Sequence, residues 1–65
     1  MSNPEKDVSK YLKSCIDNID KSVDDISIAI EEAEVNAIDA SDLENIPEDL
    51  DEMILVIREF IENNL

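Results

Sequence analysis

Apolar residues in the first half of the chain recur at alternating intervals of four and three. They are Leu12, Ile16, Ile19, Val23, Ile26, Ile30, Ala33 and Ala37. This spacing is typical of an amphipathic α-helix whose apolar seam follows a heptad repeat. Asn3 and Pro4 suit the N-cap and the first position of such a helix. The pattern therefore predicts a long first helix over about residues 4–37.

A second periodic segment begins near Pro47, which suits the first turn of a helix because it has no backbone N–H to donate. Its predicted seam consists of Leu43, Ile46, Leu50, Met53, Ile57 and Phe60. We expect a second helix over about residues 47–63 and a connection over about residues 38–46.

The connection has to end one helix and begin the next without any Gly. A left-handed residue at the end of the first helix would therefore have to be Asn36, or be absent. Further along, Ser41 and Glu44 have the spacing of a capping box, which predicts the start of a short turn.

Together these elements predict an all-α fold, a single helical domain over residues 1–65 in which a long helix and a shorter one form an antiparallel hairpin. Cys15 is the only cysteine and His is absent, which excludes a disulfide staple and a structural zinc site. A three-helix bundle is the alternative, because Ser22 and Asp25 could form a capping box that splits the first helix. The seam passes this point without a change of phase, which favours one helix.

Several apolar residues lie off both predicted seams, and two helices alone bury only one stripe each. These residues are Ile28, Val35, Leu55 and Val56. A helix that is apolar on all sides is usually buried on all sides. We therefore expect a homodimer that forms a four-helix bundle, with these four residues divided between the dimer contact and a partner site.

The acidic residues are unevenly distributed along the chain. Between Ser22 and Ile57 there are twelve Asp or Glu and no Lys, Arg or His, and the net charge of the whole chain is −13. A surface made only for solubility normally mixes both signs. A field of one sign instead acts at a distance on charged partners.

The predicted first helix groups part of these acids into two neighbouring rows, Asp24 with Glu31 and Asp25 with Glu32 and Asp39, whose members are one heptad apart. The full set of candidate acidic binding residues is Asp24, Asp25, Glu31, Glu32, Glu34, Asp39, Glu48, Asp51 and Glu52. Over the predicted hairpin the line density is about one charge per 2 Å, comparable to the density of duplex DNA.

These features predict a non-enzymatic interaction module that binds a basic protein surface. A more specific hypothesis is a nucleic-acid mimic that inhibits or regulates a nucleic-acid-binding protein. The acidic field repels nucleic acid and anionic membranes, so direct binding of either is not expected. The N-terminus lacks the apolar core of a signal peptide, and we expect a cytoplasmic protein.

A competing hypothesis is a dimeric adaptor that docks through apolar contacts. In that case the off-seam apolar residues are the anchors and the acids serve only solubility.

Another alternative is a Mg²⁺-dependent hydrolase acting on nucleotides. Glu31-Glu32 on the first helix and Glu48-Asp49-Leu50-Asp51 on the second resemble the E-E-x-x-E and E-x-x-D motifs of all-α nucleoside-triphosphate pyrophosphatases related to MazG, although the third Glu of the first motif is missing. The resemblance implies Mg²⁺ held by carboxylates from both helices. Otherwise we expect no catalytic residue, no cofactor and no bound metal, because there is no His to activate Cys15 and no Gly-rich phosphate loop.

Overall fold

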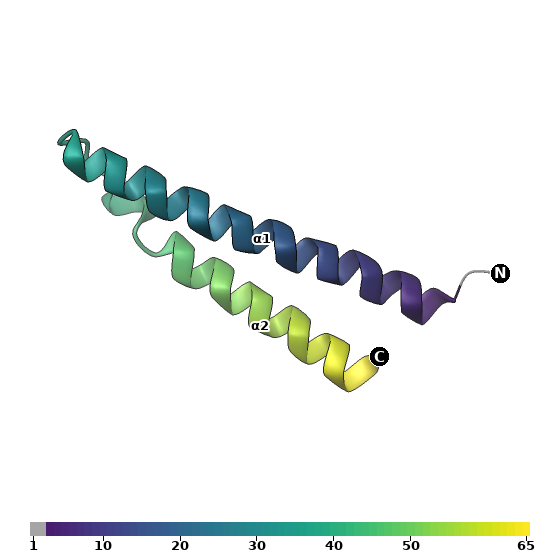
Figure 1. The fold of residues 1–65 in the computed structure, drawn as a ribbon. Coiled ribbons are helices and arrows are strands. Elements are labelled where there is room, and N and C mark those ends of the chain that lie inside the picture. Colours follow the sequence, from purple (N-terminus) through teal and green to yellow (C-terminus); the bar gives the residue numbers. More distant parts are fainter. Residues whose placement is uncertain (1–2) are drawn as a thin grey trace.

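The computed structural model describes residues 3–65, which form two helices that lie side by side and run antiparallel (Figure 1). Helix α1 spans Pro4–Val35, a 3-10 turn η1 spans Ser41–Leu43, and helix α2 spans Ile46–Asn64. Residues 3–65 contain no strand, so the predicted all-α helical hairpin is confirmed. Because α1 is unbroken from Pro4 to Val35, the alternative of a three-helix bundle, in which the first helix is split, is wrong.

The N-terminus of α1 is capped by the residue that the sequence indicated. The Asn3 side-chain oxygen accepts hydrogen bonds from the backbone N–H groups of Glu5 at 3.0 Å and Lys6 at 3.4 Å. These are two of the N–H groups that have no partner within the first turn of a helix. Pro4 follows as the first helical residue, where its missing N–H costs nothing.

The C-terminus of α1 differs from the prediction in both position and cap residue. The helix ends at Val35 rather than near residue 37, and Asn36 has an ordinary negative φ of −98°. Ala37 adopts the left-handed conformation instead, with φ of 57°. The N–H of Ile38 donates to the Ala33 carbonyl at 2.8 Å, which completes a Schellman motif. The carboxamide of Asn36 donates to the Glu32 carbonyl at 2.8 Å, so Asn36 still caps the helix through its side chain.

The turn in the connection is stabilised from its N-terminal side. The Ser41 backbone N–H donates to the carboxylate of Asp39 at 3.0 Å. This bond and a second one from the Ser41 side chain hold the pKa of Asp39 below its ordinary value of 3.8. The expected capping box between Ser41 and Glu44 is not formed, since η1 has no side-chain cap. Asp39 takes over that role because its carboxylate lies two residues before a free N–H.

The contact between the helices uses the predicted seam of α1 and a different seam on α2. Leu12 through Ala33 of the α1 seam are all at least partly buried. On α2, Ile54 is the one residue classed as buried, with 6% of its surface exposed, whereas Met53 and Phe60 remain 52% and 46% exposed. The α2 seam therefore runs through Leu50, Ile54, Ile57 and Ile61. Residues 53–57 are all apolar, so their spacing could not decide between Met53 and Ile54.

The hairpin is a single layer of helices. Its Cα atoms extend over 54 × 20 × 12 Å, and α1 and α2 are the two helices that lie side by side across this elongated shape. A domain normally packs at least two layers around a core. Only the line of contact between α1 and α2 is shielded here, and both flat faces of the layer are open.

Candidate interaction surfaces

Eight of the nine candidate acids lie on the helices, and all nine are exposed. Asp24, Asp25, Glu31, Glu32 and Glu34 belong to α1, and Glu48, Asp51 and Glu52 belong to α2. The expected row that joins Asp25, Glu32 and Asp39 is shorter than predicted. Asp39 follows the left-handed turn at Ala37 and is therefore off the helix. Within residues 22–57 each row on α1 has two carboxylates one heptad apart, and Asp17 continues the first row by one heptad into the other half.

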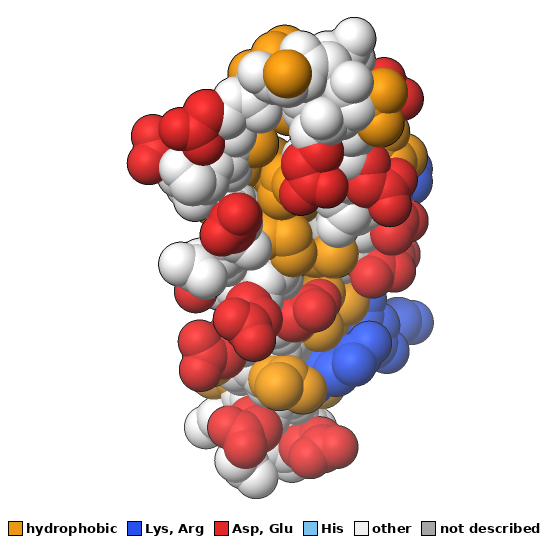
Figure 2. Space-filling model, turned by 90° about the vertical axis from the view of Figure 1, so that its left-hand side faces the viewer, with side chains coloured by type: hydrophobic (Ala, Val, Ile, Leu, Met, Phe, Trp, Pro, Cys, Tyr) orange, Lys and Arg blue, Asp and Glu red, His pale blue; other side chains and the backbone are white. Residues whose placement is uncertain are grey.

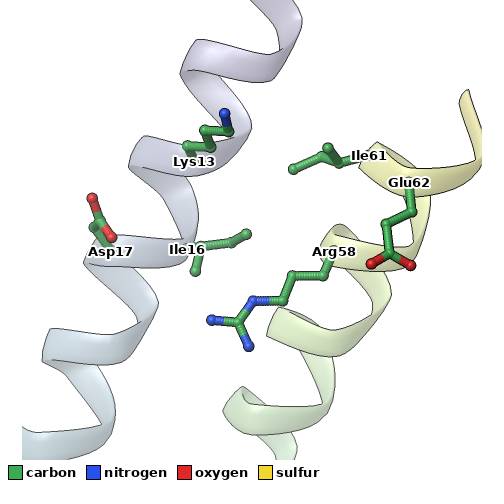
Figure 3. A pocket seen from close by; sticks show the side chains of 6 residues that line it. All are labelled: Lys13, Ile16, Asp17, Arg58, Ile61 and Glu62. Carbon is green, nitrogen blue, oxygen red and sulfur yellow. The ribbon is translucent and has the colours of Figure 1, made fainter. Parts of the chain in front are cut away.

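Folding into a hairpin separates charge along the length of the molecule. One open groove is lined by Lys13, Ile16 and Asp17 of α1 and by Arg58, Ile61 and Glu62 of α2 (Figure 3). This places the end of α2 beside the first half of α1, so Arg58 joins the four lysines of residues 3–21 at one end of the rod. The four lysines offset the four acids of residues 3–21. In residues 58–65 the single positive charge of Arg58 offsets only one of the two negative charges, those of Glu59 and Glu62. That half of the rod therefore has a net charge of −1, and the half that contains the connection, residues 22–57, has −12.

The groove in Figure 3 contains charges of both signs but no convergent set. Arg58 extends toward α1 on one side of Ile16, whereas Lys13 lies on the other side of Ile16. Asp17 and Glu62 lie on different helices, outside this pair of cations. The two cations do not point at a common position, and we assign no anion site here.

The four off-seam apolar residues are exposed, but they do not form one patch. Ile28 and Val35 are one heptad apart on α1, on its side away from α2, and Val35 is 81% exposed. Leu55 and Val56 are 58% and 63% exposed on α2. As neighbours in an α-helix they point in directions about 100° apart.

A more continuous apolar surface lies on one flat face of the layer, and Val56 is the one off-seam residue of the sequence prediction that lines it. It includes a groove lined by Ser22, Asp25, Ile26, Ala29, Ile46 and Leu50, and a second groove lined by Asp49, Glu52, Met53, Val56 and Ile57. We define the apolar face by Ser22 and Ala29 of α1 with Ile46, Met53, Ile57 and Phe60 of α2. The signal was present, because Ile46, Met53 and Phe60 are seven residues apart.

The opposite side of α2 is charged. Successive residues of a helix differ by about 100°, so Met53 and Leu55 project to opposite sides of the buried Ile54. The same rotation places three charged residues on the side of Leu55, away from the apolar face. They are Asp51, Arg58 and Glu62. Seen from the connection end, hydrophobic side chains lie in a strip with acidic side chains on both sides (Figure 2).

The expected pairing of carboxylates from the two helices is not formed. Among residues 3–65, no three Asp, Glu, Cys or His side chains lie close enough together to hold a metal ion. Glu31 and Glu32 are near the end of α1 and Glu48 and Asp51 are near the beginning of α2, but they do not form such a group. The motif resemblance therefore has no counterpart in the geometry.

Comparisons with known proteins give no family for this chain. No protein-family model matches it, and neither a curated protein nor a solved structure matches it significantly. In the part of the chain that the structure describes, no helix is both long and apolar enough to cross a bilayer.

Proposed function

We propose that this protein is a non-enzymatic, homodimeric interaction module that binds a basic protein surface through its acidic half. The observation that carries the proposal is the lengthwise separation of charge, with −12 on residues 22–57 and −1 on the remaining residues. Exposed acids concentrated at one end attract a basic partner to that end far more strongly than to the other end, whose net charge is only −1.

The candidate contact residues are the acids of this half that α1 presents in two rows. Asp24 and Glu31 form one row, and Asp25 and Glu32 form the other. The positions are spaced by about 10.5 Å along the helix axis, since each residue rises 1.5 Å. Anions held at a fixed spacing on a rigid helix can occupy a groove that binds phosphates, and a nucleic-acid-binding protein is the specific partner class we propose.

The proposal is tested by capture of host proteins on the immobilised full-length chain at low and high salt, with identification by mass spectrometry. A variant with Asp24→Asn, Asp25→Asn, Glu31→Gln and Glu32→Gln should lose basic partners. The matched control, with Glu5→Gln, Asp20→Asn, Glu59→Gln and Glu62→Gln, loses the same charge from the other half, leaves the row positions intact and should keep them. Equal capture by both variants, or capture unaffected by salt, would contradict the proposal.

If the protein is a nucleic-acid mimic, it must compete with nucleic acid for the captured partner. The complex of that partner with a fluorescent DNA or RNA duplex should be displaced by the wild-type chain and not by the variant that lacks the two rows. If the partner binds the duplex and this protein together, the acids contact another basic surface and the mimic form is wrong.

An adaptor that docks through apolar contacts is the second candidate, and the exposure of the apolar face favours it. Under that proposal the variant without the two rows keeps its partner, and a polar substitution on the apolar face releases it.

A further inference from the structure

The isolated hairpin exposes much more surface than a folded chain of its mass normally does. Its accessible surface is 5314 Å². A compact monomer of this mass, 7.3 kDa, would expose roughly 4,200 Å². The excess, roughly 1,100 Å², is similar to the area that one partner contributes to a stable protein–protein interface, about 800 Å² or more.

The radius of gyration leads to the same conclusion. It is 15.7 Å, whereas a compact chain of this length would have about 11 Å. Among residues 3–65 only Ile54 is buried, because the hairpin is a layer one helix thick. Such a layer forms the usual two-layer architecture only when a second layer covers it.

The two flat faces differ in what they can accept. One side of α2 carries Asp51, Arg58 and Glu62, which are costly to remove from water unless each finds a partner. The apolar face instead presents Ile46, Met53 and Phe60, and from α1 the small side chains of Ser22 and Ala29. The acids that line its grooves are Asp25, Asp49 and Glu52, and the rotation of the helices places them at the outer edge of the face. An added layer therefore buries most apolar area, and fewest charges, on the apolar face.

Charge then decides how a second copy is oriented. If the two connections lay at the same end, the half with −12 would face another half with −12. If they lay at opposite ends, each half with −12 would face a half with −1. Adjacent helices of a bundle are about 8–10 Å apart, close to the Debye length of about 8 Å at physiological salt, so the repulsion between facing acids is only partly screened.

We infer that the apolar face is covered by a second copy of this chain, packed antiparallel, so that the connection of each copy lies beside the chain termini of the other. This deepens the proposed homodimer. It leaves the charged sides of both hairpins outward and places one acidic half at each end of a four-helix bundle.

The first test is sedimentation equilibrium of the purified full-length chain. Wild type should sediment at twice the monomer mass of 7.3 kDa. Met53→Glu should weaken dimerisation at least tenfold, whereas Leu55→Glu should remain dimeric. These two substitutions add the same charge at similarly exposed positions on opposite sides of Ile54. A monomeric wild-type chain, or dissociation by Leu55→Glu alone, would overturn the inference.

The second test measures orientation and does not depend on a disruptive substitution. Asn45 is exposed, and its side chain makes no cap hydrogen bond. With Cys15→Ser to remove the native thiol, a spin label on Asn45→Cys should give a long interlabel distance, approaching the 54 Å length of the rod. Two connections at the same end would place the labels within about 20 Å, since packed helices are 8–10 Å apart. A short distance would overturn the antiparallel arrangement.

These measurements use the purified chain alone, so their failure is separate from failure of the acidic proposal. An antiparallel dimer that captures no basic protein supports the inference and contradicts the proposed partner. A monomer that still captures basic proteins through its acidic rows contradicts the antiparallel dimer and supports the proposed basic partner.

Discussion

The backbone N–H of Ile38 donates a 2.8 Å hydrogen bond to the carbonyl of Ala33, and this bond fixes the direction in which the chain leaves α1. It forms only because Ala37, between them, adopts φ of 57°. The left-handed conformation brings the Cβ of an L-residue close to a carbonyl oxygen, which costs a non-Gly residue about 1–2 kcal/mol of conformational free energy. The chain ends its longest helix with a strained residue.

Ala37→Gly should therefore stabilise the protein by about 1 kcal/mol, because Gly has no Cβ to strain. Ala29→Gly is the matched control, since Ala29 lies within α1 and the same change there should destabilise by about 0.5–1 kcal/mol. Chemical denaturation followed by circular dichroism measures both. If Ala37→Gly also destabilises, the left-handed turn is not the conformation that limits stability.

The hydrogen bond between Asp39 and Ser41 predicts a pH-dependent contribution to stability. Because the folded pKa of Asp39 is lowered, the contribution is present above the ordinary value of 3.8 and is lost as the pH falls through the folded value. Asp39→Ala should therefore destabilise the protein at pH 7, and the difference from wild type should vanish well below pH 3.8. Thermal unfolding at both pH values provides the measurement.

The control for this comparison is Asp42→Ala, which removes the same charge from the same connection. Asp42 lies inside η1 and does not supply the hydrogen bond to Ser41. A pH dependence that is identical in the two variants would show that charge, and not the hydrogen bond, determines the effect.

Ile54 is the residue at which loss of apolar contact should cost most. Ile54→Ala should destabilise by about 2–4 kcal/mol, the range expected when a large buried side chain is truncated. The adjacent Leu55 is 58% exposed on the charged side, so Leu55→Ala should cost about 0.5 kcal/mol or less. Urea unfolding midpoints at one fixed chain concentration compare the variants, because dimerisation makes stability concentration-dependent. Equal costs would contradict the observed α2 seam.

Repulsion among the acids of residues 22–57 should make the protein more stable in salt. Raising the salt concentration from about 0.01 M to 1 M shortens the Debye length from about 30 Å to 3 Å and should raise the unfolding temperature by several degrees. The double variant Asp24→Asn with Asp25→Asn should flatten this dependence. Asp17→Asn with Asp20→Asn should flatten it less, because those acids lie among the lysines. Differential scanning calorimetry across a salt series is the measurement.

Much of the fold could be predicted from spacing alone, and the failures have local causes. The α1 seam was clear because polar residues separate its apolar positions, and Asn3 followed by Pro4 marked its beginning. On α2 all residues from Met53 to Ile57 are apolar, so the alternation of polar and apolar positions that identifies a buried seam is missing there. The strain at Ala37 could not be anticipated, because Ala ordinarily favours helix and only the path of the chain requires a positive φ there.

The candidate surfaces were only partly predictable for a related reason. The acids could be predicted to be exposed because they are charged. Which residues of the other helix lie beside them depends on how the hairpin folds back, and the sequence pattern does not give this. Arg58 is distant from the lysines in sequence, yet folding places it at their end of the rod. Ile28 and Val35 were correctly expected to be off the seam, but the apolar face required knowledge of which side of Ile54 was open.

The uneven charge along the rod also gives each chain a large permanent electric dipole moment. The peptide dipoles of α1 and α2 run in opposite directions and cancel in part. The remainder from the longer α1 has its negative end at the connection and so adds to the dipole of the side chains. In the field of a basic protein a single chain would experience a torque that turns its connection toward that protein before contact. In an antiparallel pair the two dipoles oppose each other, the torque disappears, and both ends become equivalent points of approach.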